Sequence, residues 1–512
     1  MIPFASPALP TARLRLPPIC VPVAERSPDA LFARSTALLT DFPFQELRLD
    51  YLPEPAAALD ALRAHRAAHP EAILLATCRR IASGGEFAGD AEGERGILLG
   101  AAAAGSALVD LALESAELLG AQALVPLRET GVNVILSWHD FERTGDPGAI
   151  LARIRPFAPD FAKLVPTANC LADNLPLLQL LKDGAESAMG LIGMSMGEPG
   201  VVSRVLGPRT GSAFTFGSGT ADGATAPGQI PAPALRDLYR VGELKGETRV
   251  YGVAGSPIQS SLSPLMLNTA FHEAGVDAVY VPLLTGDAAD LVTLARGLPL
   301  AGFSVTMPLK QRIVDWLDRV DPLAARIGAV NTVRREPDGS LSGFNTDAAG
   351  ITSPLKQQIG LQGARILVLG AGGAARAAVF ACVDAGAEVS VLNRTFATAL
   401  ALAEEAGARA VHAEQIAAEP MFDVLINATP AGMRHSIATL PLLEGRLPAR
   451  LVFDLVYNPL DTPLLQRARQ EGLQILPGVE MFVHQGARQF ELWTHSAAPV
   501  KAMRGAVLAA LA

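Results

Sequence analysis

The run VILSWHD at residues 134–140 and the run FAKLVP at residues 161–166 decide how the first half of this chain is interpreted. Both are short and apolar, which predicts buried strands, yet each contains a chemically capable side chain, His139 or Lys163. A lysine is costly to bury unless it is paired or neutral. A poorly hydrated lysine loses its proton easily and can form a Schiff base, and a nearby histidine can carry protons. Each residue alone also fits an ordinary structural role. Lys163 could extend its amine to solvent, and His139 could be a hydrogen-bonded residue of the core.

Six further apolar runs flank these two and alternate with helix-length segments between residues 17 and 218. The eight predicted strands cover residues 19–23, 46–50, 73–79, 108–111, 134–140, 161–166, 191–196 and 214–217. Eight strands with helical connections predict a (β/α)8 barrel, since the competing flavodoxin-like open sheet normally stops at about five or six strands.

Side chains at the C-terminal ends of barrel strands converge on one mouth. Arg48, Arg79, His139 and Lys163 come late in their strands or just after them, and Arg204 follows the seventh strand. We expect the three arginines to form a cationic cup that binds a carboxylate and hydroxyl groups. We also expect them to keep Lys163 neutral by repulsion.

The segment TAPGQIP (225–231) is predicted to form a loop over this mouth, where Thr225 and Gln229 offer neutral hydrogen bonds. The charged, glycine-containing stretch GELKGE (242–247) follows it and indicates a linker.

A second α/β region begins near residue 249 and contains RILVLGAGGAAR at 365–376. Its strand, glycine turn and helix start match the dinucleotide-binding pattern G-x-G-x-x-[GA] at Gly370, Gly372 and Ala375. The glycines allow a close approach to a pyrophosphate, and the helix N-terminus supplies donors. A glycine turn beneath a helix could also serve packing alone.

The strand that follows this turn bears on the choice of cofactor. It ends in Asn393 and Arg394, where a cofactor with a free ribose 2′-hydroxyl usually meets Asp or Glu. An arginine suits a 2′-phosphate, so the sequence favours NADP(H) over NAD(H).

The bulk composition limits the remaining possibilities. The chain has 512 residues, a formal net charge of −9 and scattered basic residues, which argues against nucleic acid or an anionic membrane as partner. Four cysteines lie far apart without CxxC pairing, so we expect reduced thiols, no zinc motif and a cytoplasmic protein. We expect neither a signal peptide nor a transmembrane span, and no metal site.

The first half resembles type I 3-dehydroquinate dehydratases over nearly its whole length. The matching pieces are ELRLD (46–50), TCR (77–79), SWHDF (137–141), AK (162–163), VSR (202–204) and APGQ (226–229). The resemblance implies that Lys163 attacks the C3 ketone of 3-dehydroquinate, and that His139 removes the C2 proton and later protonates the departing C1 hydroxyl. It implies a substrate-binding set of Glu46, Arg48, Arg79, Arg204, Thr225 and Gln229.

Two positions depart from that family. Ser83 stands four residues after Arg79, where bacterial members often have a glutamate near the catalytic histidine, so the orientation or pKa of His139 is expected to differ. Ala112 stands where the fourth strand usually carries the glutamate of Asp-x-Glu, a change expected to affect the scaffold.

The second half resembles shikimate dehydrogenases. The matching pieces are SSLSP (260–264), VTMPLK (305–310), GAVNT (328–332), NTD (345–347), the turn at Gly370 and NATPAGM (427–433). The resemblance implies that Lys310 and Asp347 form the proton-transferring pair. It implies substrate binding by Ser261, Ser263, Thr306, Asn331, Tyr457 and Gln485, and NADP(H) binding by Gly370, Ala371, Gly372, Gly373, Ala374, Asn393, Arg394, Thr395, Leu455 and Gly478.

Other roles remain open for the proton-transferring pair, since Lys310 could be a surface lysine and Asp347 a helix N-cap. Ser304, Ser260 and Leu267 depart from the family, which usually has asparagine at the first position and often histidine at the other two. These changes are expected to affect local loop shape more than chemistry.

The combined resemblance implies a fused 3-dehydroquinate dehydratase and NADP-dependent shikimate dehydrogenase. Its expected layout is a barrel at 13–240, a linker at 241–248, a substrate-binding domain at 249–347 completed by 480–512, and a Rossmann NADP-binding domain at 348–479. The alternatives are a quinate dehydrogenase in the second half, a Schiff-base aldolase fused to another dehydrogenase, and an inactive protein that senses metabolites. The substrates implied are 3-dehydroquinate and 3-dehydroshikimate or shikimate, and the oligomeric state stays open.

Overall fold

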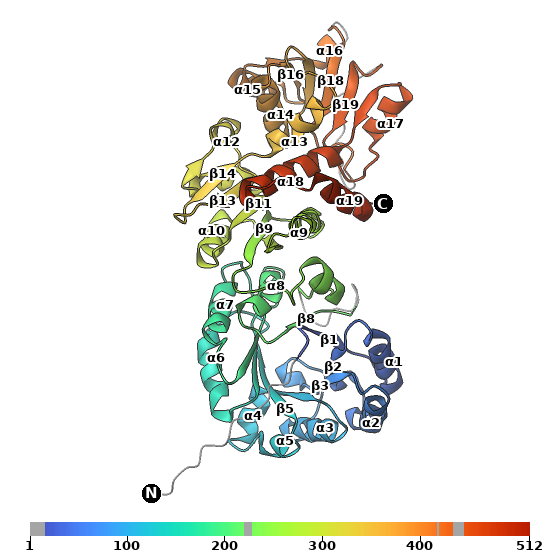
Figure 1. Cartoon of the computed structure of the whole chain (residues 1–512), viewed down its shortest axis with the longest axis vertical. Helices are drawn as coiled ribbons and strands as arrows, with labels where there is room; N and C mark the ends of the chain where they lie inside the picture. The colour runs from blue at the N-terminus through green and yellow to red at the C-terminus, as the bar shows by residue number, and fades with distance from the viewer. Residues whose placement is uncertain (1–15, 220–227, 417–418, 434–444, 512) are drawn as a thin grey trace. The chain divides into compact units, whose positions relative to one another are not determined.

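The computed structural model describes residues 16–219, 228–416, 419–433 and 445–511 of the chain. The chain divides into two units, Met1–Glu247 and Thr248–Ala512, and each is described by itself (Figure 1). The division falls inside the segment 241–248 that the sequence predicts as a linker.

The first unit is built on an eight-stranded parallel sheet in the order β7-β6-β5-β4-β3-β2-β1-β8, with helices around it (Figure 1). The strands are β1 (Ile19–Val23), β2 (Phe44–Arg48), β3 (Ile73–Thr77), β4 (Leu108–Ala112), β5 (Asn133–His139), β6 (Phe161–Val165), β7 (Gly190–Gly193) and β8 (Thr215–Phe216). The helices are α1 (Pro28–Leu38), α2 (Leu59–Ala68), α3 (Ala91–Ala103), α4 (Leu113–Leu119), α5 (Val125–Glu129), α6 (Pro147–Ile154), α7 (Asn174–Asp183) and α8 (Val201–Thr210). Short helical turns are η1 (Leu49–Tyr51), η2 (Pro55–Ala58), η3 (Ile81–Ser83), η4 (Arg155–Phe157) and η5 (Ala234–Leu238).

The two ends of this sheet meet beside β7. Leu191 bridges Ser212, and the Ala213 amide donates to the Leu191 carbonyl at 2.7 Å, which brings the ends of the ring together. The barrel predicted from the sequence is confirmed. Its strands match the predicted ones to within a few residues, although β2 begins two residues earlier and η1 follows it directly.

Inward-facing residues of the barrel form layers, because side chains alternate along each strand. The deepest layer is apolar and includes Phe44, Ile135, Phe161 and Phe214, with the Phe44 and Phe214 ring centroids 4.8 Å apart. The next layer, two residues further along the strands, is polar and consists of Glu46, Thr77, Asp110, Ser137 and Lys163. The layer after it, two residues further again, contains Arg48, Arg79 and His139. The alternation that builds the core therefore also delivers the polar groups toward the C-terminal mouth.

The second unit contains two six-stranded sheets. The first is mixed, in the order β10-β9-β11-β13-β14-β12, with β13 antiparallel to both β11 and β14. Its strands are β9 (Arg249–Gly255), β10 (Ala278–Leu284), β11 (Gly302–Val305), β12 (Arg319–Val320), β13 (Thr332–Arg335) and β14 (Leu341–Phe344). Its helices are α9 (Ser263–Glu273), α10 (Ala288–Gly297), α11 (Leu309–Arg312) and α12 (Pro322–Ile327), with the turn η6 (Val314–Trp316).

The second sheet is parallel throughout, in the order β17-β16-β15-β18-β19-β20, which is the Rossmann order 3-2-1-4-5-6. Its strands are β15 (Arg365–Leu369), β16 (Glu388–Leu392), β17 (Arg409–Ala410), β18 (Phe422–Asn427), β19 (Ala449–Asp454) and β20 (Gln474–Leu476). Its helices are α13 (Asp347–Lys356), α14 (Gly373–Asp384), α15 (Phe396–Ala406), α16 (Ala413–Ile416) and α17 (Pro463–Gln470).

The last two helices, α18 (Gly478–Thr494) and α19 (Val500–Leu511), return to the mixed sheet. They pack against α9 (Figure 1), and Phe490, Trp493 and Met503 share one apolar cluster with Tyr251 and Tyr280. The chain therefore leaves the mixed sheet, builds the Rossmann sheet and comes back. Across the parts of the chain that the structure describes, no helix is both long and apolar enough to span a bilayer.

Candidate active sites

Lys163 lies inside the barrel with 4% of its surface exposed. Its Nζ donates a hydrogen bond to Asp110 Oδ2 at 2.9 Å and lies 3.7 Å from Glu46 Oε1. The same nitrogen lies 4.2 Å from the centroid of the Phe216 ring. The amine is thus held by one carboxylate, flanked by a second and shielded from water by an aromatic face.

These neighbours differ from the predicted ones. The sequence predicts that arginines keep Lys163 neutral by repulsion, but its Nζ pairs with two carboxylates, Asp110 at 2.9 Å and Glu46 at 3.7 Å. The effect of the arginines on its charge stays a prediction. The carboxylates lie there because β2 and β4 present acidic residues in the same layer as Lys163. The Thr77 hydroxyl holds Glu46 by donating to Oε1 at 2.7 Å. Both carboxylates supply counter-charge to a positively charged nitrogen at this place.

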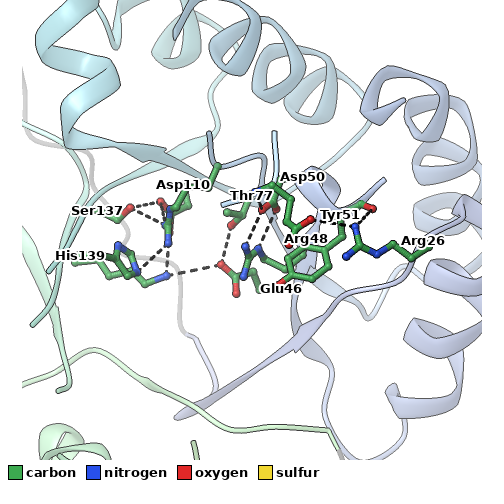
Figure 2. Close-up of polar contacts among 12 residues, drawn as sticks. Arg26, Glu46, Arg48, Asp50, Tyr51, Thr77, Asp110, Ser137 and His139 are labelled. Carbon is green, nitrogen blue, oxygen red and sulfur yellow. Dashed lines mark hydrogen bonds and ion pairs between the residues drawn. The ribbon is translucent and has the colours of Figure 1, made fainter. Parts of the chain in front are cut away.

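Asp110, labelled in Figure 2 beside Ser137, joins Lys163 to the rest of the site. Its Oδ1 accepts hydrogen bonds from the Ser137 hydroxyl and from Arg79 Nη2, the latter at 3.1 Å. Burial alone would raise the pKa of this carboxyl, but the charges of Lys163 and Arg79 outweigh burial and hold the pKa below its ordinary value. Asp110 is therefore a stable anion that orients two cationic side chains.

His139 lies at the end of β5 and contacts Arg79 rather than a carboxylate. Arg79 Nη1 is 2.8 Å from His139 Nε2, and because a guanidinium only donates, Nε2 accepts and the ring proton is assigned to Nδ1. Burial, followed by the charges of Arg79 and Lys163, holds the pKa of His139 well below its usual value. The imidazole is therefore neutral and competent to accept a proton.

The two family departures, Ser83 and Ala112, lie outside β5, the strand that carries this histidine. Ser83 belongs to η3, and its buried hydroxyl has no hydrogen-bond partner. Ala112 is 2% exposed, and its backbone amide donates to Glu94 Oε1 at 3.3 Å. The partner of His139 is Arg79. The expected difference in orientation or pKa from other family members stays a prediction.

Arg48 is fixed by a bidentate contact. Its Nε and Nη2 donate to Asp50 at 2.9 and 2.7 Å, and its guanidinium lies 4.8 Å from the Tyr51 ring, which also receives Arg26 at 5.1 Å (Figure 2). Burial would lower the pKa of Arg48, but the two hydrogen bonds to Asp50 raise it above its ordinary value. Arg48 is therefore a permanent cation in a single orientation.

One cavity at the barrel mouth gathers the predicted residues of the first half. Apolar side chains of Phe141, Met194 and Phe216 contribute to its wall. Arg204 is 2% exposed, and burial lowers its pKa to about 10. The cavity is lined by Glu46, Arg48, Arg79, His139, Lys163, Arg204 and Gln229, so the predicted cup of three arginines is formed, while Thr225 lies outside the described residues.

In the second unit, the structure joins Lys310, Asn331 and Asp347. Lys310 Nζ donates to Asp347 Oδ2 at 2.6 Å, and Asn331 Nδ2 donates to Asp347 Oδ1 at 2.7 Å. The orientation of the Asn331 amide is fixed because its Oδ1 accepts from the Thr346 backbone amide at 2.7 Å. Asp347 is the first residue of α13 and Thr346 occupies the N-cap position, so the alternative of an N-cap aspartate is wrong.

Backbone contacts bring these distant residues together. The Val330 amide donates to the Lys310 carbonyl at 2.8 Å, and the Val305 amide donates to the Asn331 carbonyl at 2.8 Å. Thr306 follows Val305 at the end of β11, and its amide bonds the Ala254 carbonyl at 2.9 Å. Lys310 is part-buried at 26% side-chain exposure, which leaves its amine accessible to a small molecule.

The other predicted substrate residues form two further groups. The Ser263 amide donates to the Ser261 hydroxyl at 3.3 Å at the start of α9. Tyr457 stacks on Phe482 with ring centroids 4.6 Å apart, and Gln485 Nε2 donates to the Phe482 carbonyl at 2.9 Å. These hydrogen bonds and this ring stacking do not connect Ser261, Ser263, Tyr457 or Gln485 to Lys310 or Asp347.

The glycine turn has the features that a dinucleotide requires. Gly370 has φ +108°, a conformation that favours glycine, and its amide bonds the Leu392 carbonyl at 2.8 Å. A Cβ at Gly372 or Gly373 would meet nothing within 4 Å, so open space lies in front of the first turn of α14. A phosphate fits there, where helix amides point outward.

The remaining predicted cofactor residues follow neighbouring strands. Arg394 is exposed just beyond β16, and Asn393 Nδ2 donates to the Thr395 carbonyl at 3.1 Å. Leu455 follows β19, and Gly478 opens α18 with a Cβ position only 2.4 Å from the Val456 carbonyl oxygen. Ala371 and Ala374 flank the two exposed glycines, so the set of residues available to an NADP(H) molecule lies along the carboxyl edge of this sheet.

Sequence reasoning missed several supporting residues. Asp110 and Ser137 organise Lys163 and Arg79, and the signal that could have identified Asp110 is the one used for Lys163, a charged residue inside an apolar strand. Gln489 and Thr332 support Asn331, with Gln489 Nε2 donating to Thr332 Oγ1 at 3.1 Å. Ser304 bonds both Tyr280 and Gln489, so this family departure belongs to the same buried network.

Comparisons with known proteins agree with both halves. The family model for type I 3-dehydroquinase matches residues 19–245. Models for the shikimate dehydrogenase substrate binding domain, shikimate / quinate 5-dehydrogenase and the shikimate 5'-dehydrogenase C-terminal domain match residues 253–333, 354–455 and 478–508.

Individual relatives give the same result. The chain is 33% identical over 503 residues to the chloroplastic bifunctional 3-dehydroquinate dehydratase/shikimate dehydrogenase of Arabidopsis thaliana, covering 94% of this chain and 82% of the relative. It is 41% identical over 285 residues to a shikimate dehydrogenase (NADP(+)) of Geobacter metallireducens, covering 52% and 99%. A solved structure of shikimate 5-dehydrogenase from Thermus thermophilus, in complex with NADP(H) and shikimate, is 41% identical with a TM-score of 0.48, covering 51% and 100%. The chain belongs to the family of bifunctional 3-dehydroquinate dehydratase/shikimate dehydrogenases.

Proposed function

We propose that this enzyme dehydrates 3-dehydroquinate to 3-dehydroshikimate in the barrel and reduces 3-dehydroshikimate to shikimate with NADPH in the second unit. The proposal makes it a lyase and an oxidoreductase in one chain. The observation that carries it is the buried Lys163 amine in a cavity shared with neutral His139 and three arginines.

The barrel chemistry begins when the Lys163 ammonium group passes a proton to a neighbouring carboxylate and the freed amine attacks the C3 ketone. That proton and one more from the nitrogen leave with the ketone oxygen as water, and the nitrogen keeps its last hydrogen as a protonated imine. Asp110 and Glu46, 2.9 and 3.7 Å from that nitrogen, stabilise the positive charge. The imine withdraws electrons from C2, so His139 can take a C2 proton. The electron pair then expels the C1 hydroxyl, which leaves as water after receiving the proton from His139. Hydrolysis frees the product and restores Lys163.

Arg48, Arg79 and Arg204 supply the cationic part of the cavity, and Glu46 and Gln229 add polar groups for the substrate hydroxyls. Thr225 is assigned the same role from the sequence. The substrate carboxylate is the group that suits guanidinium donors best. His139 Nε2 accepts from Arg79 in this structure, so the proposal requires Arg79 to release that nitrogen when substrate binds.

In the second unit, bound NADPH would supply a hydride to the ketone carbon. Gly370, Ala371, Gly372, Gly373 and Ala374 would hold its pyrophosphate, Asn393, Arg394 and Thr395 its 2′-phosphate end, and Leu455 and Gly478 its other end. Lys310 gives a proton to the developing alkoxide. Asp347 holds the ammonium group in place, and Asn331 in turn holds Asp347 by donating to its second oxygen. Ser261, Ser263, Thr306, Tyr457 and Gln485 are assigned to the hydroxyl and carboxylate groups of the ring.

Location in the cytoplasm is part of this proposal. None of the four cysteines forms a disulfide and three of them are buried, which suits a reducing compartment. The Arabidopsis relative is chloroplastic, so a cytoplasmic location for this chain rests on the cysteines alone.

A coupled assay on the purified chain tests the function. With 3-dehydroquinate alone, absorbance of the conjugated product should rise, and with NADPH added the cofactor absorbance should fall in step with shikimate formation. Rates of oxidation of quinate and of shikimate with NADP+ decide between a quinate dehydrogenase and a shikimate dehydrogenase. We expect shikimate to be the preferred substrate. A folded protein with neither activity would contradict the proposal and favour a metabolite sensor.

A further inference from the structure

Arg376 connects the cofactor turn to the proton-transfer group through contacts that the proposed chemistry does not use. It lies on the first turn of α14, with its amide bonded to the Gly372 carbonyl at 2.8 Å. Its side chain does not turn back toward the glycines. Instead, Nε donates to the Ile327 carbonyl at 2.6 Å, and Nη2 lies 3.3 Å from the Arg326 carbonyl.

Those two carbonyls end α12, which packs on β14 of the mixed sheet. The last carbonyls of a helix have no partners within it, so a guanidinium at that end satisfies them and complements the helix dipole. Gly328 stops the helix with φ +73°. Glu405 on α15 holds the same guanidinium at 2.7 Å from Nη2, which restricts Arg376 to this position.

Arg376 binds the start of the segment 326–331. This segment ends at Asn331, which belongs to the proton-transfer group with Lys310 and Asp347. The Val330 amide bonds the Lys310 carbonyl at 2.8 Å, and the Asn331 amide bonds the Phe344 carbonyl at 3.1 Å. Asn345 Nδ2 also holds the Ala329 carbonyl at 2.9 Å. Asn331 itself bonds Asp347, the partner of Lys310. The 326–331 segment is therefore tied at one end to the cofactor helix and at the other to both members of the proton-transferring pair.

We propose that Arg376 is a positioning residue for the reduction, which sets the cofactor turn at the correct distance from Lys310 and Asp347 and couples the binding of cofactor and substrate. This inference rests on the reduction proposed above. A cofactor that orders the first turn of α14 orders Arg376, and Arg376 orders the 326–331 segment. Hydride and proton transfer require both sites to be aligned at once, and small misplacements are costly to such steps. By thermodynamic linkage, substrate must then strengthen cofactor binding by the same factor by which cofactor strengthens substrate binding.

The test compares Arg376→Gln and Arg376→Lys with Arg326→Gln in the full chain. Arg326 also crosses from α12 to α14, with Nη1 2.9 Å from Asp384, so the control removes an ion pair from the same interface but leaves the α12 carbonyls capped. NADPH affinity is measured by cofactor fluorescence with and without shikimate. NADPH and shikimate are both in the reduced form, so they bind together without reacting. Dehydratase activity in the same samples reports the intact barrel.

For Arg376→Gln we expect kcat of shikimate oxidation to fall on the order of tenfold or more. We also expect the gain in NADPH affinity caused by shikimate to shrink by about fivefold, while NADPH affinity without shikimate stays within about twofold of wild type. Arg376→Lys should recover part of both losses, and Arg326→Gln should behave as wild type.

Two results would overturn the inference. One is an Arg376→Gln enzyme with unchanged kcat and unchanged coupling. The other is loss of NADPH binding in both Arg376 variants without shikimate, which would make the residue a structural or cofactor contact. An inactive wild-type enzyme would instead contradict the proposed function, so the two failures are distinguishable.

Discussion

Lys163 and Asp110 form an ion pair at 2.9 Å in the interior of the barrel, with 4% and 1% of their surfaces exposed. The same carboxylate binds Arg79, which in turn binds His139. A single buried anion thus orients the nucleophile directly and the proton-carrying histidine through one intermediary.

Replacing this anion should damage the barrel reaction selectively. In Asp110→Asn, Lys163 and Arg79 lose their shared counter-charge, so we expect the dehydratase kcat to fall about a hundredfold and stability to drop by about 3 kcal/mol. Dehydratase kinetics and denaturant unfolding measure the two effects. Glu117→Gln, which removes the exposed Arg153 pair, is the matched control and should change neither. Full dehydratase activity in Asp110→Asn would show that the anion is dispensable.

The pH dependence of dehydration should reflect the unusual partner of His139. Burial and the charges of Arg79 and Lys163 hold the pKa of this imidazole well below its usual 6.5, and the base acts only when deprotonated. As the pH falls, activity should therefore persist below 6.5 before protonation of His139 reduces it. The dependence of kcat/KM for 3-dehydroquinate on pH, measured on the acidic side, tests this prediction. A decline that begins at or above 6.5 would show that the neutral state is not favoured in solution.

Removing either member of the second proton-transferring pair should stop reduction and spare dehydration. Lys310→Met deletes the proton donor, and Asp347→Asn deletes its counter-charge, so we expect kcat losses on the order of a thousandfold for Lys310→Met and less for Asp347→Asn. NADPH affinity should remain near wild type in both. The assay is NADPH oxidation with 3-dehydroshikimate, and comparable rates in Lys310→Met would mean that another group delivers the proton.

Arg394 should determine the cofactor preference. It is exposed beyond β16, in the place where a 2′-phosphate is expected. Arg394→Ala should raise KM for NADPH about tenfold and leave KM for NADH nearly unchanged, because only NADPH carries the phosphate. Glu388→Gln, at the opposite end of the same strand, is the control. Equal changes with both cofactors would place the phosphate elsewhere.

Much of this fold was readable from the sequence because burial leaves a regular pattern. Strand-length apolar runs predicted the barrel, and the glycine turn at 365–376 predicted the Rossmann sheet. Lys163 and His139 stood out since charge inside an apolar strand is costly.

The charge surrounding Lys163 was not readable in the same way. It depends on which residues of neighbouring strands share a layer, and that is set by register, such as Ser137 opposite Lys163 and Thr77 opposite Asp110. One strand read alone carries no such information. In the second unit, the Lys310–Asp347 contact spans 37 residues and depends on backbone bonds of the 326–331 segment, which no local pattern reveals.

Borohydride reduction of the full chain in the presence of 3-dehydroquinate, followed by peptide mass analysis, tests whether Lys163 forms the Schiff base. We expect a covalent adduct on the peptide that contains Lys163, absent from Lys163→Ala, whose reduction of added 3-dehydroshikimate stays at the wild-type rate. An adduct on another peptide, or loss of both activities in a folded Lys163→Ala chain, would contradict this expectation.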